Sequence, residues 1–226
     1  MIKINLQMFG GRGASSGGEG WTGGSGGGSV NVTDVASLIS AREGQRTEVD
    51  ETLQTFKDIN AEYGYVVDDL QLVALTGSGS RTLAYYDGDN IAFNQSYFDK
   101  AKMEKVYARC VDVGFHPSQG NKTALQAVAS HEIGHALTDK AIAKMGGKFG
   151  GKFGKIDGAE AILKEAQKKV GHTGKLADMA SKISGYAKTK PREAIAEAFA
   201  DVYCNGKKAT KESQAIVNVM NNYLKS

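Results

Sequence analysis

A glycine-rich tract near the N-terminus sets the first limit on what this chain can fold into. Residues 10–29 read GGRGASSGGEGWTGGSGGGS and include eleven glycines. Such a segment has almost no apolar surface to bury, so it cannot offset the conformational entropy that it would lose on ordering. We therefore expect residues 1–30 to form a short apolar leader, INLQMF, followed by a disordered linker, and residues 31–226 to form a single folded domain.

The composition excludes several classes of protein. A net charge of +3, with 23% charged residues, demands neither a nucleic-acid nor a membrane partner. No apolar run approaches the roughly 20 residues that span a bilayer. The opening MIKINLQMF lacks the apolar region of a secretory signal peptide, so secretion by that route is not expected. Cys110 and Cys204 are too few for a disulfide scaffold, and we expect two buried thiols in a protein made in a reducing compartment.

The pattern of apolar residues predicts an α+β fold, with a small antiparallel sheet bracketed by helices. LAYYDGDNIAFN predicts a hairpin, because two short apolar runs flank residues typical of a turn. YVVDDLQLVAL, rich in β-branched residues, predicts a further strand. Helical spacing of apolar residues predicts helices over residues 32–44, 47–64, 97–113, 121–145, 159–170, 175–183, 191–204 and 213–224.

The stretch SHEIGHALTD carries the clearest chemical signal. His131 and His135 are four residues apart, so in a helix both imidazoles lie on one face and can bind one metal ion. Glu132 is placed to reach a water on that ion. This is the His-Glu-x-x-His arrangement of zinc peptidases, in which the glutamate is the general base. The alternative is an amphipathic helix that carries two imidazoles by coincidence.

A catalytic zinc site needs a third protein ligand. Thr138 and Ala141 stand where the metzincin pattern requires glycine and histidine, so that subclass is excluded. His116 and His172 lie in loop-like stretches, and we expect exposed imidazoles there rather than ligands. The remaining source is a carboxylate from a later helix.

PREAIAEAFAD supplies such carboxylates. Glu193, Glu197 and Asp201 are spaced by four and share a helix face, and the small and apolar residues between them suit burial. Three buried acids would repel one another unless cationic groups faced them. Two registers follow: Glu193 as the ligand with Glu197 behind it, or Glu197 with Asp201 behind it. The acid behind the ligand would accept the second N–H of a histidine. A solvated acidic stripe is the alternative.

The pairing of HEIGH with YAKTKPREAIAEAF resembles the gluzincins, and most closely the lethal-factor-type metallopeptidases and their relatives in phages and mobile elements. The resemblance implies a zincin-like fold, Zn²⁺ as cofactor and Glu193 as the third ligand. It also implies that Glu197 orients a ligand histidine and that Tyr186, seven residues before Glu193, stabilises the oxyanion. It further implies that the IAFN strand is a sheet edge that binds extended peptide.

The leader carries a second resemblance. INLQMFGGRG is similar to the opening of head- and capsid-associated proteins from phages of Gram-positive bacteria. This implies a phage or prophage product that is found in the bacterial cytoplasm during phage production and is a candidate for packaging into the virion. Phage capsid or head proteins are then candidate partners, beside a protein or peptide substrate.

The sequence thus predicts a zinc endopeptidase with Glu132 as general base. The alternative is a virion-associated structural or interaction protein that uses a catalytically silent zincin scaffold. Residues 140–192 hold thirteen Lys or Arg against four acids, and MGGKFGGKFGK within them predicts a lid over the substrate. No nucleic-acid-binding motif accompanies this basic segment, so nucleic acid is not an expected partner.

Overall fold

The computed structural model describes residues 29–31, 46–64, 66–67, 69–75, 77–149 and 157–225. The predicted leader, most of the predicted linker and the predicted helix over 32–44 lie outside the described residues. Most of the GGKFGGKFGK repeat lies outside them as well. In the described part of the chain, no helix is both long and apolar enough to cross a membrane.

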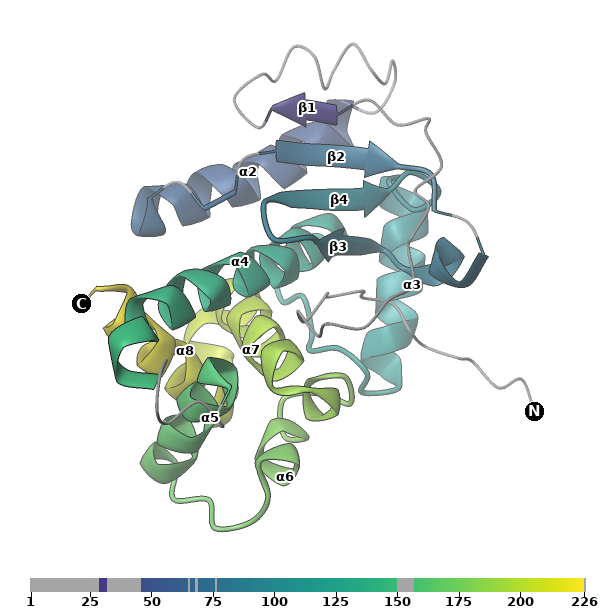
Figure 1. Cartoon of the computed structure of the whole chain (residues 1–226). Coiled ribbons are helices and arrows are strands. Elements are labelled where there is room, and N and C mark those ends of the chain that lie inside the picture. Colours follow the sequence, from purple (N-terminus) through teal and green to yellow (C-terminus); the bar gives the residue numbers. More distant parts are fainter. Residues whose placement is uncertain are drawn as a thin grey trace.

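The fold is α+β, as the sequence predicts. A four-stranded sheet has the order β1-β2-β4-β3 (Figure 1). The helices that follow it along the chain lie mostly on one side of it. The strands are β1 (Ser29–Asn31), β2 (Asp69–Val73), β3 (Ala84–Tyr86) and β4 (Asn90–Asn94).

The prediction of a purely antiparallel sheet is wrong. β1 pairs with β2, and β3 with β4, in antiparallel fashion, but β2 and β4 are parallel. The reason lies in the connection after β2. The chain passes through a 3-10 turn (Gly77–Arg81), forms β3 at the far edge and returns through the predicted hairpin, so β4 enters between β2 and β3. The hairpin itself is confirmed.

The helices that the structure describes agree closely with the periodicity of the sequence. The structure brings helices from the N-terminal and C-terminal halves of the chain together around the long helix α4 (Figure 1). The helices are α2 (Arg46–Tyr63), α3 (Lys100–Asp112), α4 (Ala124–Phe149), α5 (Gly158–Lys169), α6 (Leu176–Ala180), α7 (Pro191–Asn205) and α8 (Lys211–Leu224).

Helix α4 is the centre of the molecule. It contacts β3 on the sheet side and α7 and α8 on the other, so residues 127–138 are buried all around the helix. The small residues of this stretch let neighbouring helices approach closely. A Cβ built on Gly134 would lie 2.9 Å from Cα of Ala196 and 3.2 Å from Cβ of Phe199, both on α7. The glycine inside HEIGH therefore sets how near α7 can come to the two histidines.

A tertiary contact supports the beginning of α4, and a local sequence signal supports that of α7. The Glu104 carboxylate accepts a hydrogen bond from the backbone N–H of Ala124, at 2.8 Å, which satisfies a donor in the first turn of α4. Pro191 occupies the first turn of α7, a position where its missing N–H costs nothing. Glu193 then falls in the first turn, where the helix dipole favours a negative charge.

The two cysteines behave as predicted. Cys110 and Cys204 are both free and buried. Burial raises the pKa of each thiol to about 12, so both remain protonated at neutral pH. Neither belongs to the group of residues that could hold a metal ion among the described residues.

Candidate metal centre

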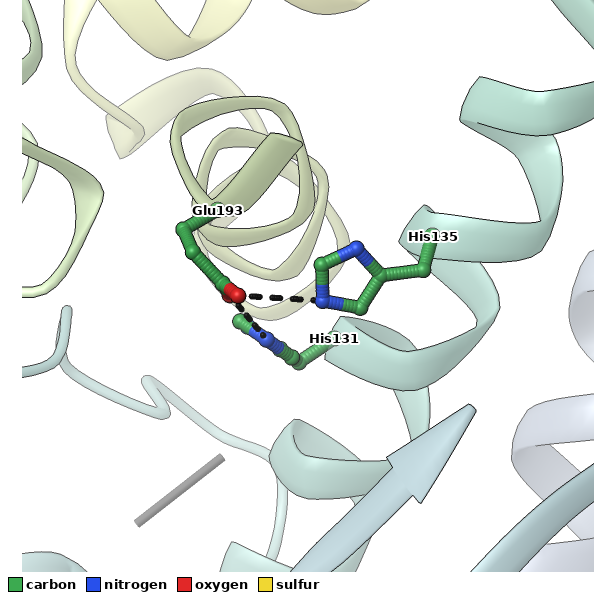
Figure 2. Close-up of side chains that lie close together, drawn as sticks. All are labelled: His131, His135 and Glu193. Carbon is green, nitrogen blue, oxygen red and sulfur yellow. Dashed lines mark ion pairs between the residues drawn. The ribbon is translucent and has the colours of Figure 1, made fainter. Parts of the chain in front are cut away.

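Two helices bring three potential ligands together. His131 and His135 project from α4, and Glu193 projects from the first turn of α7 (Figure 2). Oε2 of Glu193 lies 3.3 Å from Nε2 of His131 and 3.3 Å from Nε2 of His135. All three side chains are buried, and the group could hold a metal ion.

The distances between the donor atoms fit a small ion with tetrahedral coordination. Ligand atoms about 2.0–2.1 Å from such an ion lie about 3.3–3.4 Å from one another. Two imidazole nitrogens and one carboxylate oxygen also form a donor set that leaves a fourth position open. The two Nε2–Oε2 separations therefore match what an ion between the residues would require.

Buried polar atoms without good partners support the same interpretation. Nε2 of His135 and Oε2 of Glu193 are buried and make no hydrogen bond of good geometry within the described part of the chain. A buried polar atom left in that state costs roughly 1–3 kcal/mol. A cation among these atoms would remove the cost, because each atom has a lone pair that it can donate.

The charges at the site suit a dication. Burial acts to raise the pKa of Glu193, but His135 and His131 outweigh it and hold that pKa well below its usual range. Burial also acts to lower the pKa of His131, yet its close contacts with the carboxylates of Glu193 and Glu197 raise it to about 10. Without an ion the site thus stores a proton on His131 beside an ionised Glu193, and a metal ion would replace that proton.

Glu197 lies one turn behind Glu193 and faces the other nitrogen of His131. Its Oε1 lies 2.8 Å from Nδ1 of His131, and its Oε2 accepts a hydrogen bond of 2.7 Å from Oγ of Ser184. Burial would raise the pKa of Glu197, but His116 and His131 hold it at about 2. Since the carboxylate is ionised, Nδ1 of His131 must donate, and its Nε2 is left to face the metal position.

The geometry favours one of the two registers on α7. Asp201, the third acid of the stripe, faces neither histidine of the metal group. Its carboxylate accepts hydrogen bonds from Nδ2 of Asn205 at 2.9 Å and from the backbone N–H of Thr210 at 3.0 Å. The register with Glu193 at the ion and Glu197 behind it is therefore the one that this structure brings together. All three acids are buried, so the alternative of a solvated stripe is wrong.

Glu132 is fully buried beside the two histidines. Neither of its carboxylate oxygens makes a hydrogen bond of good geometry among the described residues, although the backbone of Tyr86 in β3 is near enough to favour the charged form. Burial raises the pKa of Glu132, and His131 and His135 partly oppose it. The side chain is a carboxylate with spare acceptor capacity next to the metal position.

Tyr186 also lies at the site. Its ring is 93% buried, and its centroid is 6.0 Å from that of His131. Burial, followed by the charges of Glu193 and Glu132, raises the pKa of the phenol well above its usual value. The hydroxyl therefore keeps its proton at any physiological pH and can act only as a hydrogen-bond donor or a neutral acceptor.

The prediction of an exposed His116 is wrong. The side chain is 2% exposed, and its Nδ1 lies 3.1 and 3.2 Å from the two oxygens of Glu197. No pattern in GFHPSQG signals this, because the partner is 81 residues away along the chain. His172 is half-buried and does not belong to the metal group.

The edge of the sheet that faces the site is β3 and not β4, so the prediction that IAFN is the edge is wrong. Hydrogen bonds join Asn94 to Leu83 and Asp87 to Asn90, and in an antiparallel ladder the alternate residues turn their backbone groups away. Ala84 and Tyr86 therefore direct N–H and C=O groups out of the sheet, on the side of α4.

Comparisons of the chain with family models, curated proteins and solved structures find no match. The group formed by residues of α4 and α7 is therefore the main indication of what this chain does.

Proposed function

We propose that this protein is a zinc-dependent endopeptidase, encoded by a phage or prophage, in which Glu132 is the general base. The observation that carries the proposal is the buried group of His131, His135 and Glu193, with the buried carboxylate of Glu132 beside it. A purely structural zinc site has four protein ligands and needs no general base. A buried Glu132 with spare acceptor capacity would lower the stability of a silent scaffold without serving any function there.

Zinc is the metal that the donor set favours. Two imidazoles and a carboxylate in a tetrahedral arrangement suit Zn²⁺ better than Mg²⁺ or Ca²⁺, which prefer sets of six or more oxygen ligands. When bound, a zinc ion supplies Lewis-acid chemistry, since it polarises a carbonyl group and makes a water molecule more acidic.

The side chains of the site would divide the work of peptide hydrolysis. Glu132 would accept a proton from the attacking water and deliver it to the nitrogen of the leaving amine. Its pKa, raised by burial, is closer to neutrality than that of an exposed glutamate and suits both steps. Tyr186 would donate its hydroxyl hydrogen to the carbonyl oxygen as negative charge develops there.

The free edge of β3 would align the substrate. An extended peptide can add to a sheet edge as a further strand, with main-chain hydrogen bonds that do not depend on its sequence. The outward-facing groups of Ala84 and Tyr86 provide such an edge, and Tyr86 is near Glu132. A peptide bound there would bring one of its bonds to the base. Phage capsid or head proteins remain proposed partners, on the resemblance of the leader alone.

The test separates metal binding from catalysis. Zinc per chain is measured by elemental mass spectrometry, and cleavage is measured with a library of unstructured peptides, for wild type and Glu132→Gln. We expect one zinc in both proteins and a loss of roughly 10²–10⁴-fold in cleavage rate for Glu132→Gln. Glu212→Gln, at a buried glutamate on α8, is the matched control and should retain full activity.

Three outcomes would contradict the proposal. A folded wild-type protein that binds no zinc when zinc is offered would remove the metal from the mechanism. Unchanged cleavage in Glu132→Gln would remove its base. Zinc binding without cleavage of any peptide or phage protein would favour the alternative, an interaction protein on a silent scaffold.

A further inference from the structure

His116 is the buried titratable group that the proposed chemistry leaves unassigned. It follows α3 in a loop, is 2% exposed, and lies outside the group that could hold the ion. A buried imidazole costs free energy unless it is well bonded. Its place beside Glu197 shows how that cost is met and what the residue can do.

Three side-chain donor atoms lie close to the Glu197 carboxylate. They are Nδ1 of His131 at 2.8 Å, Nδ1 of His116 at 3.1 Å and Oγ of Ser184 at 2.7 Å. An ionised carboxylate only accepts hydrogen bonds, so Nδ1 of His116 carries the hydrogen of this contact. His116 and His131 therefore hold the same carboxylate from two directions, and Glu197 cannot swing toward one without leaving the other.

His116 is itself held firmly. Its ring stacks on that of Tyr107, with centroids 5.5 Å apart and planes at 9°, and the Tyr107 hydroxyl donates to the backbone oxygen of Pro117 at 3.1 Å. The imidazole is thus fixed by the element that precedes it along the chain. A fixed donor can in turn fix the acceptor that it contacts.

The backbone next to His116 also joins the segment that carries Tyr186. The N–H of Gly185 donates to the oxygen of Gly114 at 2.7 Å, and the N–H of Tyr186 donates to the oxygen of Phe115 at 3.0 Å. Ser184, in the same segment, reaches Glu197 through its hydroxyl. The loop of His116 and the segment of Tyr186 are therefore connected twice, once through the backbone and once through Glu197.

We propose that His116 is a positioning residue of the metal centre, which acts through Glu197 to orient the ligand His131 and so raises the affinity of the site for zinc. The proposal rests on the proposed function for the identity of the metal, and not for any step of catalysis. Loss of a partner that contacts a ligand histidine directly typically lowers metal affinity about 10–100-fold, and His116 lies one contact further from the ion, so its loss should have the smaller effect of about tenfold.

Three substitutions separate the hydrogen bond from the packing of the ring. His116→Phe keeps an aromatic ring against Tyr107 but removes the donor. His116→Asn keeps a donor nitrogen on Cγ, where Nδ1 stands. His116→Gln places its nitrogen one bond farther out and so misses that position. His172→Phe, at a half-buried histidine outside the metal group, is the matched control.

The experiment measures the zinc dissociation constant of each protein by competition with a chromophoric chelator. We expect affinity to fall about tenfold in His116→Phe, to stay within about threefold of wild type in His116→Asn, and to be unchanged in His172→Phe. If His116→Phe does not fold, His116→Gln takes its place, with a loss larger than that of His116→Asn.

A double-mutant cycle with Glu197→Gln tests whether the effect passes through Glu197. The loss caused by His116→Phe should largely disappear in the Glu197→Gln background, because the two residues act as one unit. The same loss in both backgrounds, or full affinity in both His116→Phe and His116→Gln, would overturn the proposal. A wild-type protein that binds no zinc overturns the proposed function as well, whereas tight binding that is insensitive to residue 116 overturns this inference alone.

Discussion

The two ends of α7 carry the same kind of residue and do different work. Glu193 and Glu197 at the beginning of the helix face the imidazoles of α4, whereas Asp201 near its end binds the turn that leads into α8. All three acids are buried and spaced by four residues. The difference shows that spacing can place acids on one face, but only the neighbouring element decides whether an acid meets a metal site or a backbone N–H.

Substitution of Glu193 should produce the largest difference in zinc affinity between the two ends of α7. We expect Glu193→Ala to lose more than about 100-fold in zinc affinity, because a direct ligand contributes more than the partner of a ligand. Asp201→Ala should bind zinc as wild type does. Equilibrium dialysis with zinc analysis by mass spectrometry measures both. Equal losses in the two variants would mean that the ends of α7 do not differ as the structure implies.

Glu197→Gln should have the next largest effect. An amide keeps the shape of the side chain but offers only one acceptor oxygen to the three donors that face it. We expect zinc affinity to fall about 10–100-fold. The measurement is the same chelator competition, with Glu212→Gln as the control for a buried glutamate elsewhere. A loss larger than that of Glu193→Ala would move the ligand one turn along α7.

The zinc affinity should also rise with pH. His131 holds its proton up to a pKa of about 10, so between pH 6 and pH 9 the proton competes with zinc for Nε2. Glu193 has a pKa well below its usual range and stays ionised throughout, so it adds no competition. Loss of one proton per ion corresponds to an increase approaching tenfold per pH unit. Calorimetry in buffers of different ionisation enthalpy counts the protons that are released for each zinc ion bound. A count of zero would contradict a protonated His131 in the metal-free site.

Gly134→Ala should disturb both the N-terminal end of α7 and the packing of α7 against α4. The new methyl group would meet the backbone of Ala196 at 2.9 Å, so α7 must move away from α4. We expect about 1–3 kcal/mol of lost stability, as for other overpacked cores. Zinc affinity should fall with it, because Glu193 moves with α7. Thermal unfolding with and without zinc measures both effects, and Gly146→Ala on the same helix, where a Cβ meets nothing within 4 Å, is the control.

Asp201→Asn should give the smallest effect and one that is confined to stability. In the wild type, Asn205 and the backbone N–H of Thr210 donate hydrogen bonds to the Asp201 carboxylate. The amide of asparagine would replace one of its two acceptor oxygens with an N–H₂ group, which cannot accept. We expect a loss of about 1–2 kcal/mol in the free energy of unfolding, measured with urea. Zinc per chain should stay as in wild type. A loss of zinc in this variant would show that the far end of α7 supports the metal centre after all.

Much of the site could be predicted from the sequence because helical periodicity is a local property. The distance between His131 and His135 follows from four residues of α-helix, and so does the shared face of Glu193 and Glu197. The helices themselves follow from the spacing of their apolar residues. The resemblance to the gluzincins implied Glu193 as a ligand and Tyr186 at the site, and the structure brings both residues to the two histidines.

The predictions that failed concern long-range partners. The sheet is mixed because the chain crosses to the far edge before it returns, and the pattern of alternation in a strand says nothing about the order of strands. For the same reason the edge beside the site is β3, although the sequence made β4 seem the edge. His116 was predicted to be exposed because a loop carries no periodic signal, and its burial depends on a loop that folds against α7.

Helical spacing in the sequence identifies the side chains that can act together on each helix: two imidazoles and a base on α4, and a row of acids on α7. Which of these acids meets the imidazoles depends on the packing of the two helices, through the close crossing of α4 and α7 at Gly134. Packing also brings His116 and His131 to the same carboxylate, that of Glu197. The physical reason is that a helix fixes angles over four residues, whereas the distance between two helices depends on the packing of the side chains between them.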